Sequence, residues 1–178
     1  MVYIMGLIGV ALIVAADKIT KFLAVEHIAP RTPPGISIID GVFSLFYSTN
    51  DGAAFGILSG QSLLLSAVSA VITVGLVYFY IRLPKYVGAG KVRTAIRVAM
   101  TMVAGGAVGN LIDRVRPPHE VVDFLYFELI NFPIFNVADI FIVCGSILLC
   151  ALLVFFVKDE KPKNELEEMK EETVKNVE

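Results

Sequence analysis

The chain has 178 residues, of which 56% are hydrophobic and only 18% are charged, and its formal net charge is -2. A soluble domain is usually about 45–50% apolar and about 25% charged, so this composition does not fit an ordinary soluble domain. The net charge says nothing about nucleic acid, but the sequence has no basic arm and no basic patch with interleaved aromatic residues, so we expect no nucleic-acid partner.

The excess of apolar residues is concentrated in four stretches that contain no charged residue. These stretches are residues 1–16, 52–81, 98–112 and 140–157. A helix of about 20 apolar residues crosses the roughly 30 Å hydrocarbon core of a bilayer. We therefore predict an all-α membrane protein with four transmembrane helices in one domain, residues 1–157. The expected spans are about 3–23, 61–82, 94–112 and 137–157.

The first apolar stretch is predicted to be a retained span. A cleavable secretory signal begins with a positively charged region, and no basic residue precedes Lys18 here. Asp17 and Lys18 follow this stretch at the expected outer end of the helix. They could serve either as anchors at the membrane interface or as part of a functional site.

The next segment, residues 25–60, is predicted to contain a small β-hairpin. Its Asp40-Gly41 pair suits a tight turn. The apolar residues that flank this turn are Ile36, Ile38, Val42, Phe43, Leu45 and Phe46. The hairpin is expected to lie on the outer membrane surface.

Charged residues predict the orientation of the chain. The segment between the second and third spans is rich in lysine and arginine and has no acid, so it should be cytoplasmic. Its basic residues are Arg82, Lys85, Lys91, Arg93 and Arg97. Both termini then lie on the same side, including a charged cytoplasmic tail at residues 158–178. Residues 25–60 and 113–136 face outward.

The end of the third span carries a cluster of small and polar residues. Gly106, Asn110, Asp113 and Arg114 fall on one face of a helix. Glycines allow helices to approach closely, and polar side chains can join helices inside a membrane. Arg114 could pair with Asp113 or Asp17. Both a structural and a catalytic use of this cluster remain open at this point.

Two aspartates are the strongest candidates for chemistry. Asp123 stands in an apolar setting, where an isolated charge is costly. Asp139 falls in the first turn of the fourth helix, which Asn136 is expected to cap. Carboxyl groups brought together can share one proton, so that one activates water while the other polarises a peptide carbonyl. Taken alone, Asp139 could also simply complement the helix dipole.

The remaining polar features give weaker signals. Asn50 and Gly52 lie in a loop of small residues, where an amide could hold a peptide main chain or simply form a turn. His27 and His119 are isolated and lack the spacing of metal ligands. We therefore expect no metal and no organic cofactor.

Five short motifs occur in a fixed order along residues 5–155. They are Asp17-Lys18-x-Thr20-Lys21, Asn50-x-Gly52-Ala53-Ala54-Phe55, Gly105-Gly106-Ala107-x-Gly109-Asn110-x-Ile112-Asp113-Arg114, Val122-Asp123-Phe124 and Phe135-Asn136-x-Ala138-Asp139. Together they resemble lipoprotein signal peptidase, also called signal peptidase II. The chain departs from the family in its Lys18 and in its lack of tryptophan.

The resemblance implies an aspartic endopeptidase of the bacterial cytoplasmic membrane. Such an enzyme removes signal peptides from prolipoproteins by cutting before a diacylglyceryl-modified cysteine, and we expect it to act as a monomer. The resemblance places catalysis on Asp123 and Asp139 and makes the hairpin segment a β-cradle on the outer membrane face. It assigns substrate binding or site support to Asp17, Asn50, Gly52, Asn110, Asp113, Arg114, Asn136 and Ala138.

Two other classes of function compete with a peptidase. A small proton- or ion-coupled transporter would also use membrane carboxylates, but it predicts acids near the middle of the membrane and broken or repeated helices. A non-catalytic assembly protein would use the same glycines and polar groups for packing alone. It predicts that replacing Asp123 or Asp139 with asparagine leaves function intact.

Overall fold

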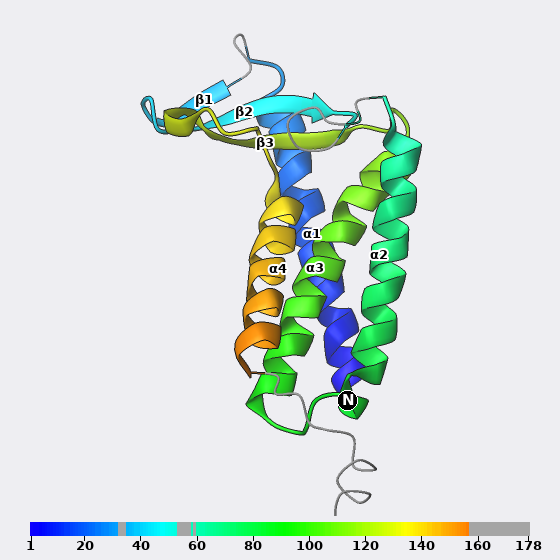
Figure 1. Cartoon of the computed structure of the whole chain (residues 1–178). Coiled ribbons are helices and arrows are strands. Elements are labelled where there is room, and N and C mark those ends of the chain that lie inside the picture. Colours follow the sequence, from blue (N-terminus) through cyan, green and yellow to red (C-terminus); the bar gives the residue numbers. More distant parts are fainter. Residues whose placement is uncertain (32–34, 53–57, 59, 157–178) are drawn as a thin grey trace, which may run out of the picture.

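The computed structural model describes residues 1–31, 35–52, 58 and 60–156. Four long helices run side by side, and a small sheet lies across one end of them (Figure 1). The elements in chain order are α1 (Val2–His27), β1 (Gly35–Ile39), β2 (Phe43–Asn50), α2 (Ser62–Arg82), α3 (Lys91–Val115), β3 (Val121–Phe127) and α4 (Val137–Phe156). Short 3₁₀ turns occupy Leu83–Lys85 and Glu128–Ile130. The expected tail at 158–178 lies outside the described residues.

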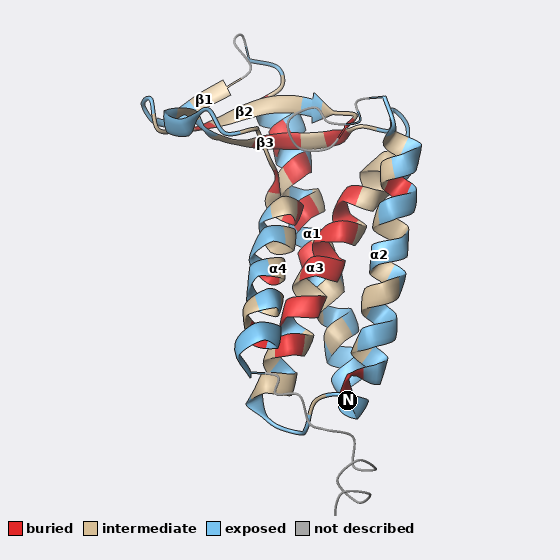
Figure 2. Ribbon diagram, viewed as in Figure 1, coloured by how far each residue is buried: buried red, intermediate tan, exposed pale blue. Residues whose placement is uncertain are grey.

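All four helices are long and apolar enough to cross a membrane. Their apolar side chains point outward to an extent that would be unfavourable in water. Leu63 on α2 is 81% exposed and Phe155 on α4 is 77% exposed. The exposed outer faces of α2 and α4 are visible in Figure 2. These faces suit contact with lipid, so the chain is a multi-pass membrane protein.

Helix α3 is the centre of the bundle. In its most apolar window 56% of the residues are buried, against 6–11% in the other three helices. It packs against α1, α2 and α4 because its second half is built of small residues. A Cβ atom added at Gly106 would contact the Ala138 carbonyl oxygen and would lie 2.8 Å from Cγ1 of Ile142. Gly106 thus allows the backbones of α3 and α4 to approach closely.

The sheet has the order β1-β2-β3, and both pairs of strands are antiparallel. The predicted hairpin is confirmed, because β1 and β2 flank a turn at Asp40-Gly41. Gly41 has a φ of +70°, a left-handed conformation that glycine adopts without strain. The hairpin therefore forms where the turn residues indicated.

Strand β3 was not among the strands that we predicted. It lies in the second outward segment, residues 113–136, in which no strand was predicted. In the structure β3 pairs with β2 from Phe43↔Phe127 to Asn50↔Val121. This pairing joins residues far apart in the chain, so no turn sequence between neighbouring strands could predict it. Its burial also follows no strict alternation, because both of its faces contact protein.

Three helix ends lie several residues beyond the expected spans. Helix α1 continues past residue 23 to His27, and α3 begins at Lys91 rather than at 94. Hydropathy marks the part of a helix that contacts lipid, whereas backbone hydrogen bonds continue past it. Helix α3 ends only at Val115, shortly before Pro117. Asp113 and Arg114 therefore lie in its last turn.

The connection between β3 and α4 brings the two candidate acids together. The backbone N–H groups of Phe124 and Leu125 donate to the Phe135 carbonyl, and the Phe135 N–H donates to the Leu125 carbonyl. This exchange folds the start of α4 back against the middle of β3. Asn136 follows directly and lies beside Asp123.

Candidate active site

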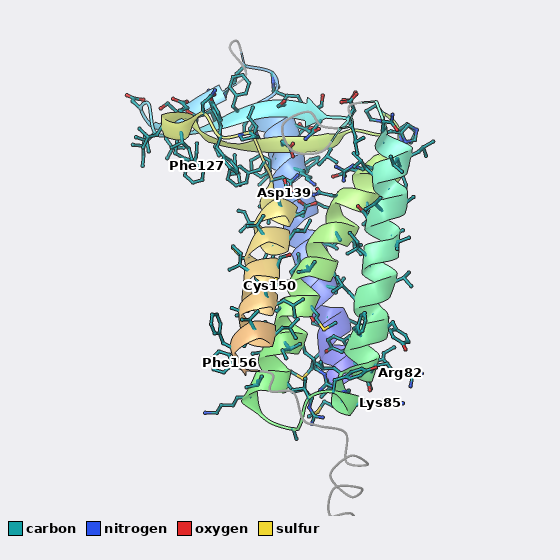
Figure 3. The ribbon with its side chains drawn as sticks, viewed as in Figure 1. Arg82, Lys85, Phe127, Asp139, Cys150 and Phe156 are labelled. Carbon is teal, nitrogen blue, oxygen red and sulfur yellow. The ribbon has the colours of Figure 1, made fainter. Side chains whose placement is uncertain are left out.

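The two candidate acids lie where the sheet meets the helices. Asp139 occupies the first turn of α4 just beneath the sheet, whereas Arg82 and Lys85 lie at the opposite end of the bundle (Figure 3). Asp123 comes from β3 and is only 3% exposed. A buried carboxylate needs hydrogen-bond partners.

Asn136 connects the two acids. Its side-chain Nδ2 donates to Oδ1 of Asp123 at 2.6 Å. Its Oδ1 accepts from the Asp139 N–H at 3.0 Å, and its own N–H donates to Oδ2 of Asp139 at 3.1 Å. This reciprocal pair is a capping box, so Asn136 caps α4 as expected. One buried amide side chain thus fixes the start of α4 and contacts both acids.

Two further amides complete the hydrogen bonding of the acids. Asn110 on α3 donates from Nδ2 to Oδ1 of Asp139 at 2.7 Å. Its Oδ1 accepts from Nδ2 of Asn136 at 3.1 Å. Asn50 at the end of β2 donates to Oδ2 of Asp123 at 3.1 Å. Every carboxylate oxygen of the two acids therefore accepts at least one N–H.

The environment of Asp123 changes its acidity. Burial raises the pKa of Asp123 from 3.8 to about 6, and the negative charge of Asp139 adds to this effect. Hydrogen bonds from Asn50 and Asn136, together with the positive charge of Lys21, lower the pKa of Asp123 and oppose the rise. A carboxyl group with a pKa of about 6 can accept or release a proton near neutral pH, as acid–base catalysis requires.

Arg114 does not make the ion pair that the sequence suggested. Its Nη2 donates to the Gly52 carbonyl at 3.0 Å, and the Gly52 N–H donates to Oδ1 of Asn50 at 2.9 Å. Within the described part of the chain, Asp17 and Asp113 pair with lysines of α1 instead. Adjacent residues on a helix point about 100° apart, so Asp113 faces α1 while Arg114 reaches the end of β2. The guanidinium still lies within electrostatic range of Asp123 and Asp139.

Four charged side chains of α1 and α3 form a group that we call the α1–α3 ion cluster: Asp17, Lys18, Lys21 and Asp113. Asp17 is completely buried, and its Oδ1 accepts from the Ala138 N–H at 3.1 Å. Lys21 lies 2.9 Å from Oδ2 of Asp17 and 2.7 Å from Oδ2 of Asp113. Lys18 pairs with the other oxygen of Asp113. Asp17 is thus a buried link between α1 and α4, and not an interfacial anchor.

The structure brings all of the residues expected at the site into one connected network. Asn50 forms the turn that was one of its two expected uses, because its Oδ1 accepts from the Gly52 N–H, and its Nδ2 also donates to Asp123. Lys21 was quoted only as part of a motif, and it proves to be buried within the site. Its spacing of four residues from Asp17 on a helix was the signal that could have identified it. Residues 53–55 of the second motif lie outside the described residues.

The site is rich in hydrogen-bond donors to carboxylates. Among the residues that the structure describes, no three or more His, Cys, Asp or Glu side chains are grouped as metal ligands would be. The donors are side-chain amides, an ammonium group and backbone N–H groups. Such an arrangement holds carboxyl groups in place and controls their protons.

Comparison with known proteins gives one consistent family. The family model described as signal peptidase (SPase) II matches residues 9–155. The lipoprotein signal peptidase of Caldanaerobacter subterraneus subsp. tengcongensis is 40% identical over 152 residues, which cover 85% of this chain and 97% of that protein. The lipoprotein signal peptidase of Brevibacillus brevis is 43% identical over 151 residues, covering 85% and 94% of the two chains.

Solved structures agree with the sequence relatives. A bacterial membrane enzyme determined by the in meso method at 2.3 Å resolution superposes with a TM-score of 0.72 and 30% sequence identity. The match covers 88% of this chain and 92% of that one. The four-helix arrangement with its small sheet therefore occurs in a bacterial membrane enzyme of similar sequence.

Proposed function

This chain belongs to the signal peptidase II family, and on that premise we propose that Asp123 and Asp139 are its catalytic pair. The family assigns the chain the function of a membrane protease that removes signal peptides from prolipoproteins. A transporter is not favoured. The observation that carries the proposal is that one residue, Asn136, donates to both carboxylates: its side-chain Nδ2 donates to Asp123 and its backbone N–H donates to Asp139.

The reaction follows from two carboxyl groups that hold one proton between them. The charged member removes a proton from a water molecule, whose oxygen attacks the scissile carbonyl carbon. The protonated member donates a hydrogen bond to the carbonyl oxygen as negative charge develops there. A proton then passes to the peptide nitrogen, the C–N bond breaks, and the products are a carboxylic acid and an amine. The titration belongs to the pair and not to either residue alone.

The neighbours of the pair have supporting roles in this proposal. Asn110 and Asn136 fix the orientation of the two carboxyl groups, and Asn50 holds Asp123 from the β2 side. The positive charge of Arg114 stabilises the anionic pair, and its bond to Gly52 orders the end of β2. The remaining site residues, Asp17, Asp113 and Ala138, join α1, α3 and α4 beneath the pair.

The position of the pair suits a lipid-anchored substrate. A cysteine that carries a diacylglyceryl group keeps its acyl chains in the bilayer and its backbone at the interface. Asp139 lies at the end of α4 next to the sheet (Figure 3), and Asp123 lies on strand β3 of that sheet, so the pair is at a corresponding depth. We propose that cleavage occurs just before this cysteine, on the outer face of the bacterial cytoplasmic membrane. The opposite, basic end carries Arg82 and Lys85, so both termini are cytoplasmic.

A cleavage assay tests this function. The full chain, purified in detergent, is incubated with a diacylglyceryl-modified prolipoprotein and separately with the same precursor lacking the lipid. We expect a product that begins with the modified cysteine, and much slower cleavage of the unmodified precursor. No cleavage of the modified precursor would refute the function. Equal rates for both precursors would refute the proposed role of the lipid.

A further inference from the structure

Lys21 is an unusually well-paired ammonium group for a membrane helix. It is 4% exposed, and its Nζ lies 2.9 Å from Asp17, 2.7 Å from Asp113 and 2.8 Å from Oδ1 of Asn110. An ammonium group has three N–H donors and accepts no hydrogen bond. The contacts to Asp113 and Asn110 are hydrogen bonds, and the contact to Asp17 is an ion pair. One of the two hydrogen bonds is to a neutral amide that contacts the catalytic pair.

The bond from Lys21 helps to fix which way the Asn110 amide points, together with the weaker bond from Nδ2 of Asn136 to the same oxygen at 3.1 Å. Since Lys21 can only donate, the oxygen of the Asn110 amide must face α1. The amide nitrogen then faces α4, where it donates to Oδ1 of Asp139. Turning the amide over would place its oxygen against the Asp139 carboxylate and its N–H₂ against the ammonium. Both contacts would be repulsive.

We propose that Lys21 is a positioning residue for the reaction, acting on Asp139 through the side-chain amide of Asn110. The inference rests on the proposed function of Asp123 and Asp139. Lys21 itself contacts neither acid within hydrogen-bond distance, so it is not a catalytic residue. Its role is to hold the amide donor that fixes one member of the pair.

The charge of Lys21 has a second consequence for the pair. The charged groups that act on Asp123 are Asp139 from α4, Arg114 from α3 and Lys21 from α1. Lys21 lowers the pKa of Asp123, so the loss of its charge would raise that pKa further. A higher pH would then be needed to ionise the pair. The acid limb of the rate profile should therefore move to higher pH.

Lys18 provides a matched control on the same helix. Its Nζ pairs with Asp113 and donates to the Gly109 carbonyl at 2.8 Å, but it does not contact Asn110. Replacing Lys18 with methionine removes one charge from the α1–α3 ion cluster and leaves the bond from Lys21 to Asn110 in place. A purely structural ion cluster would respond alike to the loss of either lysine.

The experiment compares Lys21→Met, Lys21→Gln and Lys18→Met in the full chain, with kcat and KM measured across pH on a diacylglyceryl-modified prolipoprotein. We expect Lys21→Met to lower kcat about 10–100-fold, the size expected from the loss of a hydrogen bond that involves a charged group, with KM changed less than about twofold. Its acid limb should move to higher pH. Lys21→Gln keeps a donor without the charge, so it should show the same pH shift with a smaller loss of kcat. Lys18→Met should keep the wild-type pH profile.

Two results would overturn the inference. One is a Lys21→Met variant with wild-type kcat and pH profile, whatever its thermal stability. The other is a Lys18→Met variant with the same kinetic change as Lys21→Met. If Lys21→Met does not fold, the milder Lys21→Gln decides, and an unshifted acid limb refutes the proposal. Failure of the catalytic pair is recognised separately, because an active Asp123→Asn enzyme would refute the pair whatever Lys21 does.

Discussion

Asn136 has two functions that a pair of substitutions can separate. As the cap of α4 it only needs an oxygen that accepts from the Asp139 N–H. As the link between the acids it needs the N–H₂ group that donates to Asp123 and Asn110. A serine at this position can still cap the helix, but its short hydroxyl cannot reach Asp123. Alanine can do neither.

The size of the effect follows from the bonds that are lost. Asn136→Ser removes a 2.6 Å hydrogen bond to Asp123, and a hydrogen bond to a charged group is worth about 1.5–3 kcal/mol. If this loss appears in the transition state, kcat falls about 10- to 150-fold, because about 1.4 kcal/mol corresponds to a factor of ten. Asn136→Ala should lose as much activity. It should also lose about 1 kcal/mol of stability, the usual cost of removing a cap.

The assay measures kcat for each variant and its thermal midpoint in the same detergent. Asn131→Gly serves as a control, since Asn131 is exposed, has a left-handed φ of 46° that glycine tolerates, and accepts from the Tyr126 hydroxyl at 2.8 Å, away from the acids. We expect Asn136→Ser to unfold at a higher temperature than Asn136→Ala, because serine keeps the cap, and to lose as much activity. Wild-type kcat in a folded Asn136→Ser enzyme would refute the linking role of this amide.

Three further predictions concern packing, pH and metals. Gly106→Leu should push α3 away from α4 and lower kcat about 100-fold, because a displacement of about 1 Å at a catalytic site can have an effect of this size. Gly75→Leu, on the open face of α2, should remain active. Equal activities of the two variants would contradict the close packing of α3 on α4. Since the folded pKa of Asp123 is about 6 and its ordinary value is 3.8, the stability it contributes is present below about pH 4 and lost as pH rises through 6. Thermal midpoints measured from pH 4 to 7 should therefore fall more in the wild type than in Asp123→Asn, and parallel curves would contradict this. A chelator should leave the cleavage rate unchanged, because the carboxylate oxygens are already engaged by N–H donors, and strong inhibition by EDTA would contradict that arrangement.

The membrane spans could be predicted because one energy term, the free energy of placing a charged side chain in hydrocarbon, determines where they are. A charged side chain is expensive in hydrocarbon, so the charge-free stretches mark where lipid must be. The same argument cannot locate helix ends. Lys91 and Arg93 are charged and yet helical, because the backbone hydrogen bonds of α3 continue beyond its lipid-facing part. The turn of the hairpin was predictable for a local reason, the Asp40-Gly41 pair.

The candidate acids were identifiable because a charged carboxyl group is energetically unfavourable in apolar surroundings. Asp123 stands among apolar residues, and such a carboxyl group needs a reason to be there. Its partners were harder to predict, since β3 pairs with β2 across a long stretch of chain and places Asn50 against Asp123. The direction of Arg114 and the burial of Lys21 depend on how α1 and β2 pack on α3. A single sequence does not specify that packing.

The most direct test of the account is the cleavage rate of Asp123→Asn and Asp139→Asn, each shown to be folded by its thermal midpoint. Asp40→Asn, in the exposed hairpin turn, is the matched control and should cleave the diacylglyceryl-modified prolipoprotein like the wild type. We expect each single substitution in the pair to reduce turnover by several powers of ten, and the double substitution to be no worse, because the two acids act as one unit. Normal turnover by either folded single variant would contradict the claim that Asp123 and Asp139 share a proton to hydrolyse the peptide.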